Sequence, residues 1–316
     1  MFVYLKKLFA MILTVLLVLL ITFVTFEIIP GNPALSRLGV DAQESQYEAL
    51  SAELGLDDPL GIRLSRWLKG LFTGDLGISM RYSVPVSELI LDRLPVTISL
   101  AVMALALIIL IGIPLGIVSA KYGERLPGVM ITLISQIGMA IPSFWSGIIL
   151  IYIFGILLRW VSPGGYVPWS EDAYGAFKSL ILPAIAIALP SIASVIRYTR
   201  NSVMDQMKND YVRLAMSKGM NLNSVLLRHV LKNALIPIIT VLGMITANIL
   251  GGSIVIEQVF TLPGVGRLLI NAITTRDLPL VQGMVLYIAF IVVIINFFID
   301  VIYTVIDPRI RLGQRD

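Results

Sequence analysis

Long apolar runs separated by short polar stretches dominate this chain of 316 residues. The first run covers residues 8–29, and as a helix it would rise about 33 Å, enough to cross the hydrocarbon core of a bilayer. Five further runs follow, at about 96–120, 131–158, 179–196, 234–256 and 281–306. The pattern predicts an all-α polytopic membrane protein with six transmembrane helices.

Two of these runs contain prolines that disturb a regular helix. The third is long and contains Pro142, so we expect a tilt or a kink there. The fourth is short and carries Pro183 and Pro190. The first run is too long for the apolar core of a usual signal peptide, and no small-residue cleavage site follows it, so we interpret it as a retained anchor.

Composition supports a membrane protein and excludes several kinds of chemistry. Hydrophobic residues make up 57% of the chain and charged residues only 14%, whereas a soluble domain carries about 25% charged residues. There is no cysteine and a single histidine, His229, so thiolate or multi-imidazole metal sites are excluded. No Gly-Lys pair and no G-x-S-x-G motif occurs, which argues against a P-loop and a serine hydrolase. We therefore predict no enzyme activity, no metal and no cofactor bound by this chain.

The distribution of charge predicts the orientation. Six spans place both termini on one side, and if that side is the cytoplasm, the inner segments hold 14 basic and 6 acidic residues against 10 and 14 outside. The positive-inside rule favours this arrangement. Both termini are then cytoplasmic, and residues 30–94 form a large extracytoplasmic insertion.

One helix is expected inside this insertion, in the stretch "DDPLGIRLSRWLKGLFTG" at 57–74. An aspartate precedes it as a cap, Pro59 stands in its first turn and Gly74 lies just past its end. Its apolar residues share one face, which the basic residues avoid: Leu60, Leu64, Trp67, Leu68, Leu71 and Phe72 against Arg63, Arg66 and Lys69. We interpret it as a helix that packs on the membrane surface or the bundle, with a docking surface for a soluble partner as the alternative.

The inner loop at about 197–233 is longer than a turn requires. It carries seven basic and two acidic residues and is interrupted by Gly219.

Few ionisable groups lie within the spans. Asp300, with Asn296 one turn away, is expected to face the bundle and to pair with Arg197 or Arg200. A membrane path without an energy source of its own suggests that another polypeptide supplies energy through the loop.

Several stretches carry a family resemblance. The loop "DYVRLAMSKGMNLNSVLLRHVLKNALIP" resembles the EAA loop of binding-protein-dependent ABC transporter permeases, although only Ala215 and Gly219 match its generic form. Further stretches agree: "EIIPGNPA" (27–34), "FTGDLGISM" (72–80), "VPVSELILDRLPVTISLA" (84–101), "GGSIVIEQVFTLPGVGRLLINAITTRDLPLVQG" (251–283) and "DPRIR" (307–311). Together they resemble the dipeptide/oligopeptide/nickel permease family in its first-subunit form.

The resemblance implies an architecture and an assembly. The fold would be that of a type I ABC importer permease, with residues 1–95 as first helix plus insertion and 96–316 as the core permease domain. A second homologous permease completes the pathway, two cytoplasmic ATPases hold ATP and Mg, and an extracytoplasmic binding protein delivers substrate. The location would be the cytoplasmic membrane of a bacterium or archaeon, with no role for nucleic acid.

It also implies functional residues. The ATPase-coupling segment would contain Asp210, Tyr211, Arg213, Ala215, Lys218 and Gly219. Residues Pro263, Gly264 and Gly266 would belong to a re-entrant segment at the outer mouth, or else to an ordinary turn. The residues that bind substrate are unknown. We favour peptides because no run of metal-binding side chains lines the spans. A nickel or metal-chelate importer, a self-sufficient secondary carrier and a structural or sensory subunit remain alternatives.

Overall fold

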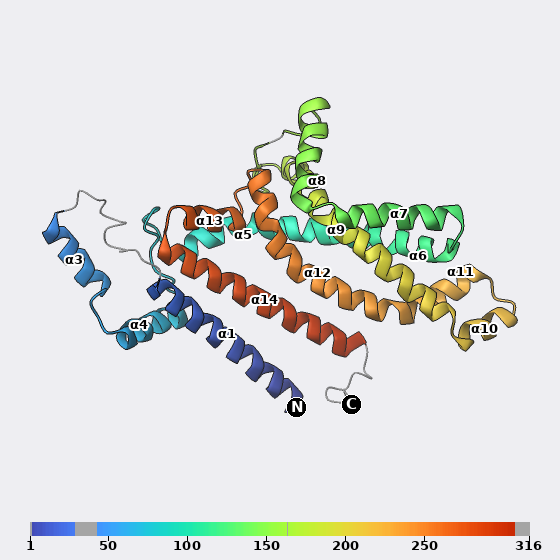
Figure 1. Ribbon diagram of the computed structural model, residues 1–316, viewed down its shortest axis with the longest axis horizontal. Coiled ribbons are helices and arrows are strands. Elements are labelled where there is room, and N and C mark those ends of the chain that lie inside the picture. Colours follow the sequence, from blue (N-terminus) through green and yellow to red (C-terminus); the bar gives the residue numbers. More distant parts are fainter. Residues whose placement is uncertain (1, 29–42, 163, 307–316) are drawn as a thin grey trace. The chain divides into compact units, whose positions relative to one another are not determined.

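The computed structural model describes residues 2–28, 43–162 and 164–306, and this part of the chain is almost wholly helical (Figure 1). Four helical stretches within it are long and apolar enough to cross a membrane, and a bent pair of helices makes a possible fifth. Helix α1 (Phe2–Ile28) coincides with the first predicted span, and its apolar part covers Met11–Thr25. The predicted all-helical membrane class is thus confirmed, whereas the sixth span stays a prediction.

The chain divides into two compact units. Unit 1 comprises Met1–Pro95 and Arg267–Ile294, and unit 2 comprises Val96–Gly266 and Ile295–Asp316. Unit 1 contains α1, α3 (Glu44–Leu54), α4 (Leu60–Thr73), the start of α5 (Val86–Leu107), most of α13 (Val265–Thr274) and the start of α14 (Leu278–Ile306).

Helix α4 matches the helix predicted in the insertion, with one correction. Gly74 ends it in the left-handed conformation (φ 79°), as its position suggested. The aspartate cap was wrong, because Pro59 is the N-cap residue and no side chain caps the helix. The carboxylate of Asp58 instead forms an ion pair with Arg66, one turn and a half into the helix.

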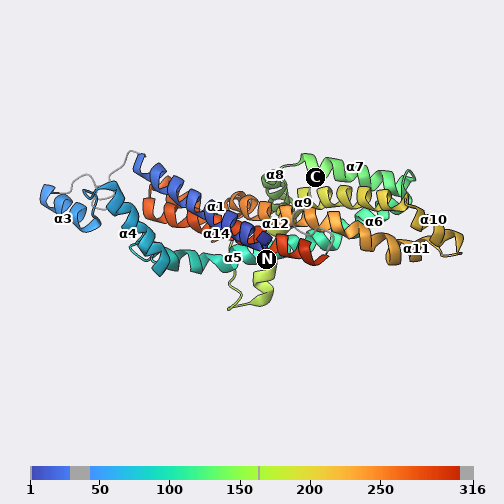
Figure 2. The same cartoon turned by 90° about the horizontal axis from the view of Figure 1, so that it is seen from below.

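In unit 2 the central element is α9 (Ala173–Met207), a single helix of 35 residues. Figures 1 and 2 show α6 (Ile113–Tyr122) and α7 (Leu126–Ala140) beside it, and α8 (Ser143–Leu150) and α12 (Leu231–Val259) also contact it. The core consists of aliphatic side chains from α5, α9 and α12, among them Leu100, Ala188 and Ile245.

Glycine allows the closest of these contacts. A Cβ atom on Gly116 of α6 would lie only 2.5 Å from Cβ of Thr199 and 2.9 Å from the carbonyl oxygen of Ile196, both in α9. The backbones of α6 and α9 therefore approach at a distance that only glycine permits, as small residues commonly allow between membrane helices.

Proline breaks the third predicted span far more sharply than a tilt. The helices on either side of Ile141 and Pro142 are bent by 100°. Both residues are extended, with ψ angles of 119° and 143°, because proline disfavours the helical conformation of its predecessor and has no N–H to donate. The second half continues from α8 into a π-helical segment, Ile151–Leu157.

By contrast, α9 passes through Pro183 and Pro190 without a break, which makes the fourth span longer than expected. Pro190 removes the hydrogen bond that the carbonyl of Ala186 would otherwise accept. The hydroxyl of Ser146, in α8, lies 3.3 Å from this carbonyl oxygen and 2.7 Å from that of Ser143 in its own helix. Its single hydrogen is thus divided between the two carbonyls, and a neighbouring helix supplies a polar contact to the backbone group that the proline leaves free.

Candidate functional site

A short helix between α9 and α12 forms the centre of the predicted coupling segment. Helix α9 ends at Met207, Asn209 is the N-cap residue in an extended conformation, and α10 (Asp210–Ser217) follows with eight residues. Asn221 then caps α11 (Leu222–Val225) by accepting a hydrogen bond from the N–H of Ser224 at 2.8 Å. Figure 1 shows α10 and α11 together at one end of α9 and α12.

The inner face of α10 is fixed to the rest of unit 2. Val212 is buried in an apolar cluster with side chains from α6, α9, α11 and α12, and Ala215 packs against the same cluster. The hydroxyl of Tyr211 donates to Oε1 of Gln206 in α9 at 2.9 Å and accepts from Nδ2 of Asn233 in α12 at 3.5 Å. These contacts attach α10 to both long helices.

The outer face of α10 is free in the isolated chain. Leu214 is 57% exposed and Met216 47% exposed. These two residues are two positions apart on the helix and therefore lie on opposite flanks of the outer face. The side chains of Asp210, Arg213 and Lys218 are also exposed, and Arg213 lies 3.9 Å from the carboxylate of Asp210. An exposed ion pair of this kind contributes little to stability. Leu214 and Met216, rather than Ala215, are therefore the exposed apolar side chains of α10.

Gly219 produces the sharp turn expected after this helix. Its φ angle is 83°, a conformation that a β-carbon disfavours. Its N–H donates to the carbonyl of Met216 at 3.0 Å, and the N–H of Met220 donates to that of Ala215 at 3.3 Å. The turn reverses the chain from α10 into α11 and brings Met220 onto the inner cluster.

The other predicted residues lie elsewhere. Pro263 is half-buried and Gly264 and Gly266 are buried, between the end of α12 and the first turn of α13. Asn296 is exposed on α14, while the side chain of Asp300 is outside the described residues, so its pairing with a basic residue stays a prediction.

Of the two expected partners of Asp300, Arg197 is exposed and lies 5.2 Å from the centre of the Tyr198 ring. Arg200 carries a buried Nε atom without a hydrogen-bond partner among the described residues. If Asp300 pairs with Arg200 rather than Arg197, its carboxylate would thus supply an acceptor for this buried N–H group.

Two buried carboxylates were missed by the sequence analysis. Glu257, near the end of α12, is 0% exposed, and Asp277, before α14, is 1% exposed. Asp277 accepts hydrogen bonds from the Ser79 hydroxyl at 2.5 Å and from the N–H groups of Met80 and Leu280 at 3.1 and 3.3 Å. Its place immediately before an apolar helix is the signal of an N-cap residue, and it was available in the sequence.

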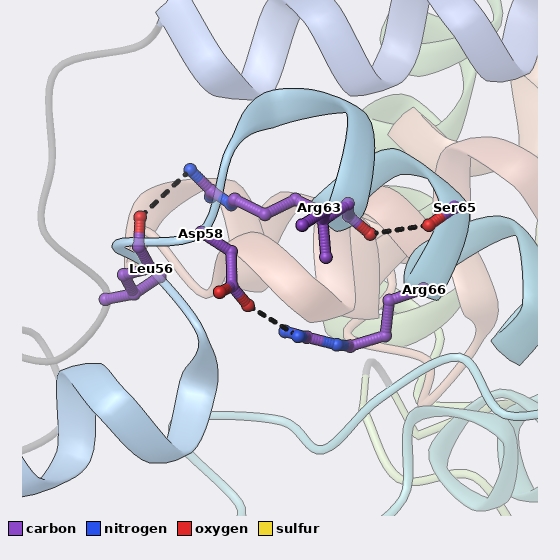
Figure 3. A network of polar contacts seen from close by, with 6 residues as sticks. Leu56, Asp58, Arg63, Ser65 and Arg66 are labelled. Carbon is purple, nitrogen blue, oxygen red and sulfur yellow. Dashed lines mark hydrogen bonds and ion pairs between the residues drawn. The ribbon is translucent and has the colours of Figure 1, made fainter.

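Unit 1 has a pocket of about 340 Å³ between α1, α4, the segment 75–80 and the first turns of α14. At its wall Arg63 forms an ion pair with Glu27 at 2.9 Å. Figure 3 shows Arg63 next to the carbonyl of Leu56, to which it donates at 3.5 Å, and Arg66 paired with Asp58. Each guanidinium group is paired with a carboxylate, so the positive charges of Arg63 and Arg66 at this wall of the pocket are neutralised. Among the described residues no group of three or more histidine or acidic side chains gathers to hold a metal ion.

Comparison with known proteins identifies the family. A family model described as "Binding-protein-dependent transport system inner membrane component" matches residues 112–312, and the model of its N-terminal part matches residues 1–101. The chain belongs to this family of permeases.

Named relatives of this permease share most of its length. A putative peptide transport system permease protein of Brucella abortus (strain 2308) is 44% identical over 90% of this chain and 91% of its own. The oligopeptide transport system permease protein AppB of Bacillus subtilis (strain 168) is 38% identical over 89% and 90%. The dipeptide transport system permease protein DppB of Alkalihalophilus pseudofirmus is 36% identical over 97% and 98%.

A solved structure supports the fold of the permease. The MetNI methionine ABC transporter, in an inward-facing conformation, matches with a TM-score of 0.54 over 69% of this chain and 96% of the matched chain, at 15% identity. The permease therefore has the type I ABC importer fold, as the sequence resemblance implied.

Proposed function

We propose that the chain is one of two permease subunits of an ATP-driven importer that carries peptides across the cytoplasmic membrane. The observation that carries this proposal is the similarity, over about nine tenths of both chains, to permeases named for peptides, oligopeptides and dipeptides. Two cytoplasmic ATPases bind ATP and Mg, a second homologous permease completes the pathway, and an extracytoplasmic binding protein delivers the peptide.

Within this proposal, α10 is the contact through which the ATPases act on the permease. It is short, its inner face is attached to α9 and α12, and its outer face presents Leu214 and Met216. A helix fixed in this way transmits displacement, because its backbone hydrogen bonds are internal and its packed face cannot slide. The exposed charges of Arg213 and Lys218 are placed to meet acidic groups on the ATPase.

The proposal keeps the predicted organisation of the chain. Both termini and the loop at 197–233 are cytoplasmic, residues 1–95 supply the first helix and the extracytoplasmic insertion, and residues 96–316 form the core domain with five spans. Residues 263–266 lie at the outer mouth. The charge distribution supports this orientation.

Two alternatives are less well supported. The relatives named above are peptide permeases, which favours peptides over nickel or a metal chelate. A self-sufficient secondary carrier would need no ATPase, whereas the family is one of binding-protein-dependent transport components.

The test is transport by the purified complex of this permease with its second permease and ATPases, reconstituted in proteoliposomes with the binding protein. We expect uptake of a labelled peptide that requires ATP hydrolysis and the binding protein. Uptake by this permease alone along an ion gradient would contradict the proposal. Uptake of nickel but of no di- or oligopeptide would overturn the assignment of substrate.

A further inference from the structure

Glu257 lies at the end of α12 with its carboxylate enclosed by protein. The side chain is fully buried, and Oε1 accepts a hydrogen bond of 2.7 Å from the hydroxyl of Thr97 in α5, 160 residues away in sequence. A carboxylate in an apolar membrane protein is costly unless donors surround it. The contact with Thr97 is therefore part of what allows an acidic residue at this position.

Thr97 also forms a hydrogen bond with the next helix, α13. Its Oγ1 atom accepts a hydrogen bond of 2.9 Å from the N–H of Val265, the first residue of α13. A hydroxyl has one hydrogen to donate and free lone pairs to accept. Donation to Glu257 thus leaves Thr97 able to receive the first N–H of α13, which no carbonyl of its own helix can accept.

The backbone after α12 folds closely around the carboxylate. A Cβ atom on Gly264 would collide with the carboxylate carbon and oxygens of Glu257, and one on Gly266 would lie 3.0 Å from Oε2. The reversal is also held by the backbone, since the N–H of Leu262 donates to the carbonyl of Glu257 at 2.8 Å. Gly264 is thus required by the space that the Glu257 side chain occupies, and Gly266 mainly by Ile254, whose Cα would lie 2.5 Å from a Cβ there.

The position of this cluster in the chain connects it to α10. Helix α12 follows directly from α11 and a π-helical segment, Leu226–Val230, and its 29 residues span about 43 Å. Glu257 thus sits at the far end of the helix whose near end is attached to α10. If α10 is displaced, α12 moves with it, and the contacts of Glu257 transmit this movement to residues 260–266.

We infer that Glu257 and Thr97 are positioning residues for the segment 260–266, which they hold against α5 so that it follows α12 during transport. This inference rests on the proposed function, in which 263–266 lie at the outer mouth. When the link between Thr97 and Glu257 is lost, the segment moves independently of α12, and ATP hydrolysis no longer produces uptake at the normal ratio.

The test uses the complete transporter in nanodiscs and proteoliposomes, with Thr97→Val, the conservative Thr97→Ser and, as a second route to the same defect, Gly264→Ala. Hydrogen exchange is measured over residues 260–270, together with peptide uptake per ATP hydrolysed. For Thr97→Val we expect about tenfold faster exchange at Val265, which corresponds to about 1.4 kcal/mol, and a several-fold lower ratio of uptake to hydrolysis. Thr97→Ser, which keeps the hydroxyl, should show normal exchange at Val265 and a normal ratio of uptake to hydrolysis. Gly264→Ala should lower this ratio.

Two results would overturn the inference. One is unchanged exchange at Val265 and an unchanged ratio in Thr97→Val. The other is a parallel loss of uptake and hydrolysis with the ratio preserved in both Thr97→Val and Gly264→Ala, which would mean that the cluster only stabilises the fold. Failure of the proposed function is distinguishable, because the unmodified complex would then show no ATP-driven peptide uptake at all.

Discussion

At the scale of single residues, Gly219 has a role that its backbone angle defines. Replacing it with valine places a β-branched side chain at φ 83°, and we expect a loss of stability of about 1–2 kcal/mol. Helix α10 should then lose its fixed approach to α11. Thermal unfolding of the detergent-purified protein and uptake by the complex measure the two effects.

Gly61→Ala provides the control for this substitution. Gly61 lies inside α4, and no neighbouring atom lies within 4 Å of the position that a Cβ atom would take there. Alanine at this position should therefore be neutral or slightly stabilising. Equal unfolding midpoints for Gly219→Val and Gly61→Ala would show that the turn tolerates a side chain and that the argument is wrong.

Asp277 is the residue whose loss should be most damaging to unit 1. Alanine would leave the buried hydroxyl of Ser79 and the N–H groups of Met80 and Arg81 without their acceptor, at about 1–3 kcal/mol for each group that water cannot reach. We expect Asp277→Ala to lower the unfolding midpoint strongly and Asp277→Asn, which keeps one acceptor, to lower it less. Identical midpoints for the two variants would contradict this view of the cluster.

At the scale of the elements, α8 and α9 depend on each other through Ser146. The hydroxyl of Ser146 lies within hydrogen-bond reach both of the carbonyl that Pro190 leaves free and of the Ser143 carbonyl in its own helix, so Ser146→Ala should cost about 1 kcal/mol. Ser65→Ala is the matched control, because that hydroxyl donates to a carbonyl of its own exposed helix. Denaturant unfolding that affects both variants equally would mean that the carbonyl of Ala186 has no need of this donor.

The sequence predicted the elements better than their breaks and contacts. The length and spacing of the apolar runs located the long helices. Gly74 and Gly219 marked two helix ends, because left-handed φ angles favour glycine. The pattern did not distinguish Pro142, which ends a helix, from Pro190, which does not. At Pro190 the Ser146 hydroxyl lies within reach of the free carbonyl, and a tertiary contact of this kind cannot be read from the sequence.

The coupling role of α10 stays a prediction, and the sequence did not determine which side of this helix is exposed. The family resemblance placed Ala215 and Gly219 in the coupling segment without indicating which way the side chain of Ala215 points. In the structure Ala215 packs inward and Leu214 and Met216 point outward. Eight residues contain too few helical turns for the hydrophobic pattern to fix the face, so only the packing against α9 and α12 determines it.

At the scale of the whole molecule, the orientation in the membrane can be tested by chemical labelling, since the chain has no cysteine. We expect Ala52→Cys to react from outside with an impermeant maleimide and Ser217→Cys to react only after permeabilisation. Ser51→Cys serves as a buried control, because Ser51 is 2% exposed. Labelling of Ser217→Cys from outside in intact cells would reverse the proposed topology.

The most direct test of the central claim is peptide uptake by the complex that carries Leu214→Asp. If α10 couples the ATPases to the permease, a carboxylate placed in this packed contact is left unpaired, which costs several kcal/mol of association. The account predicts a permease at normal amount in the membrane, with loss of bound ATPase and of ATP-driven uptake. Asn223→Asp, on the exposed surface of α11, should leave both intact. Normal uptake with Leu214→Asp would contradict the account.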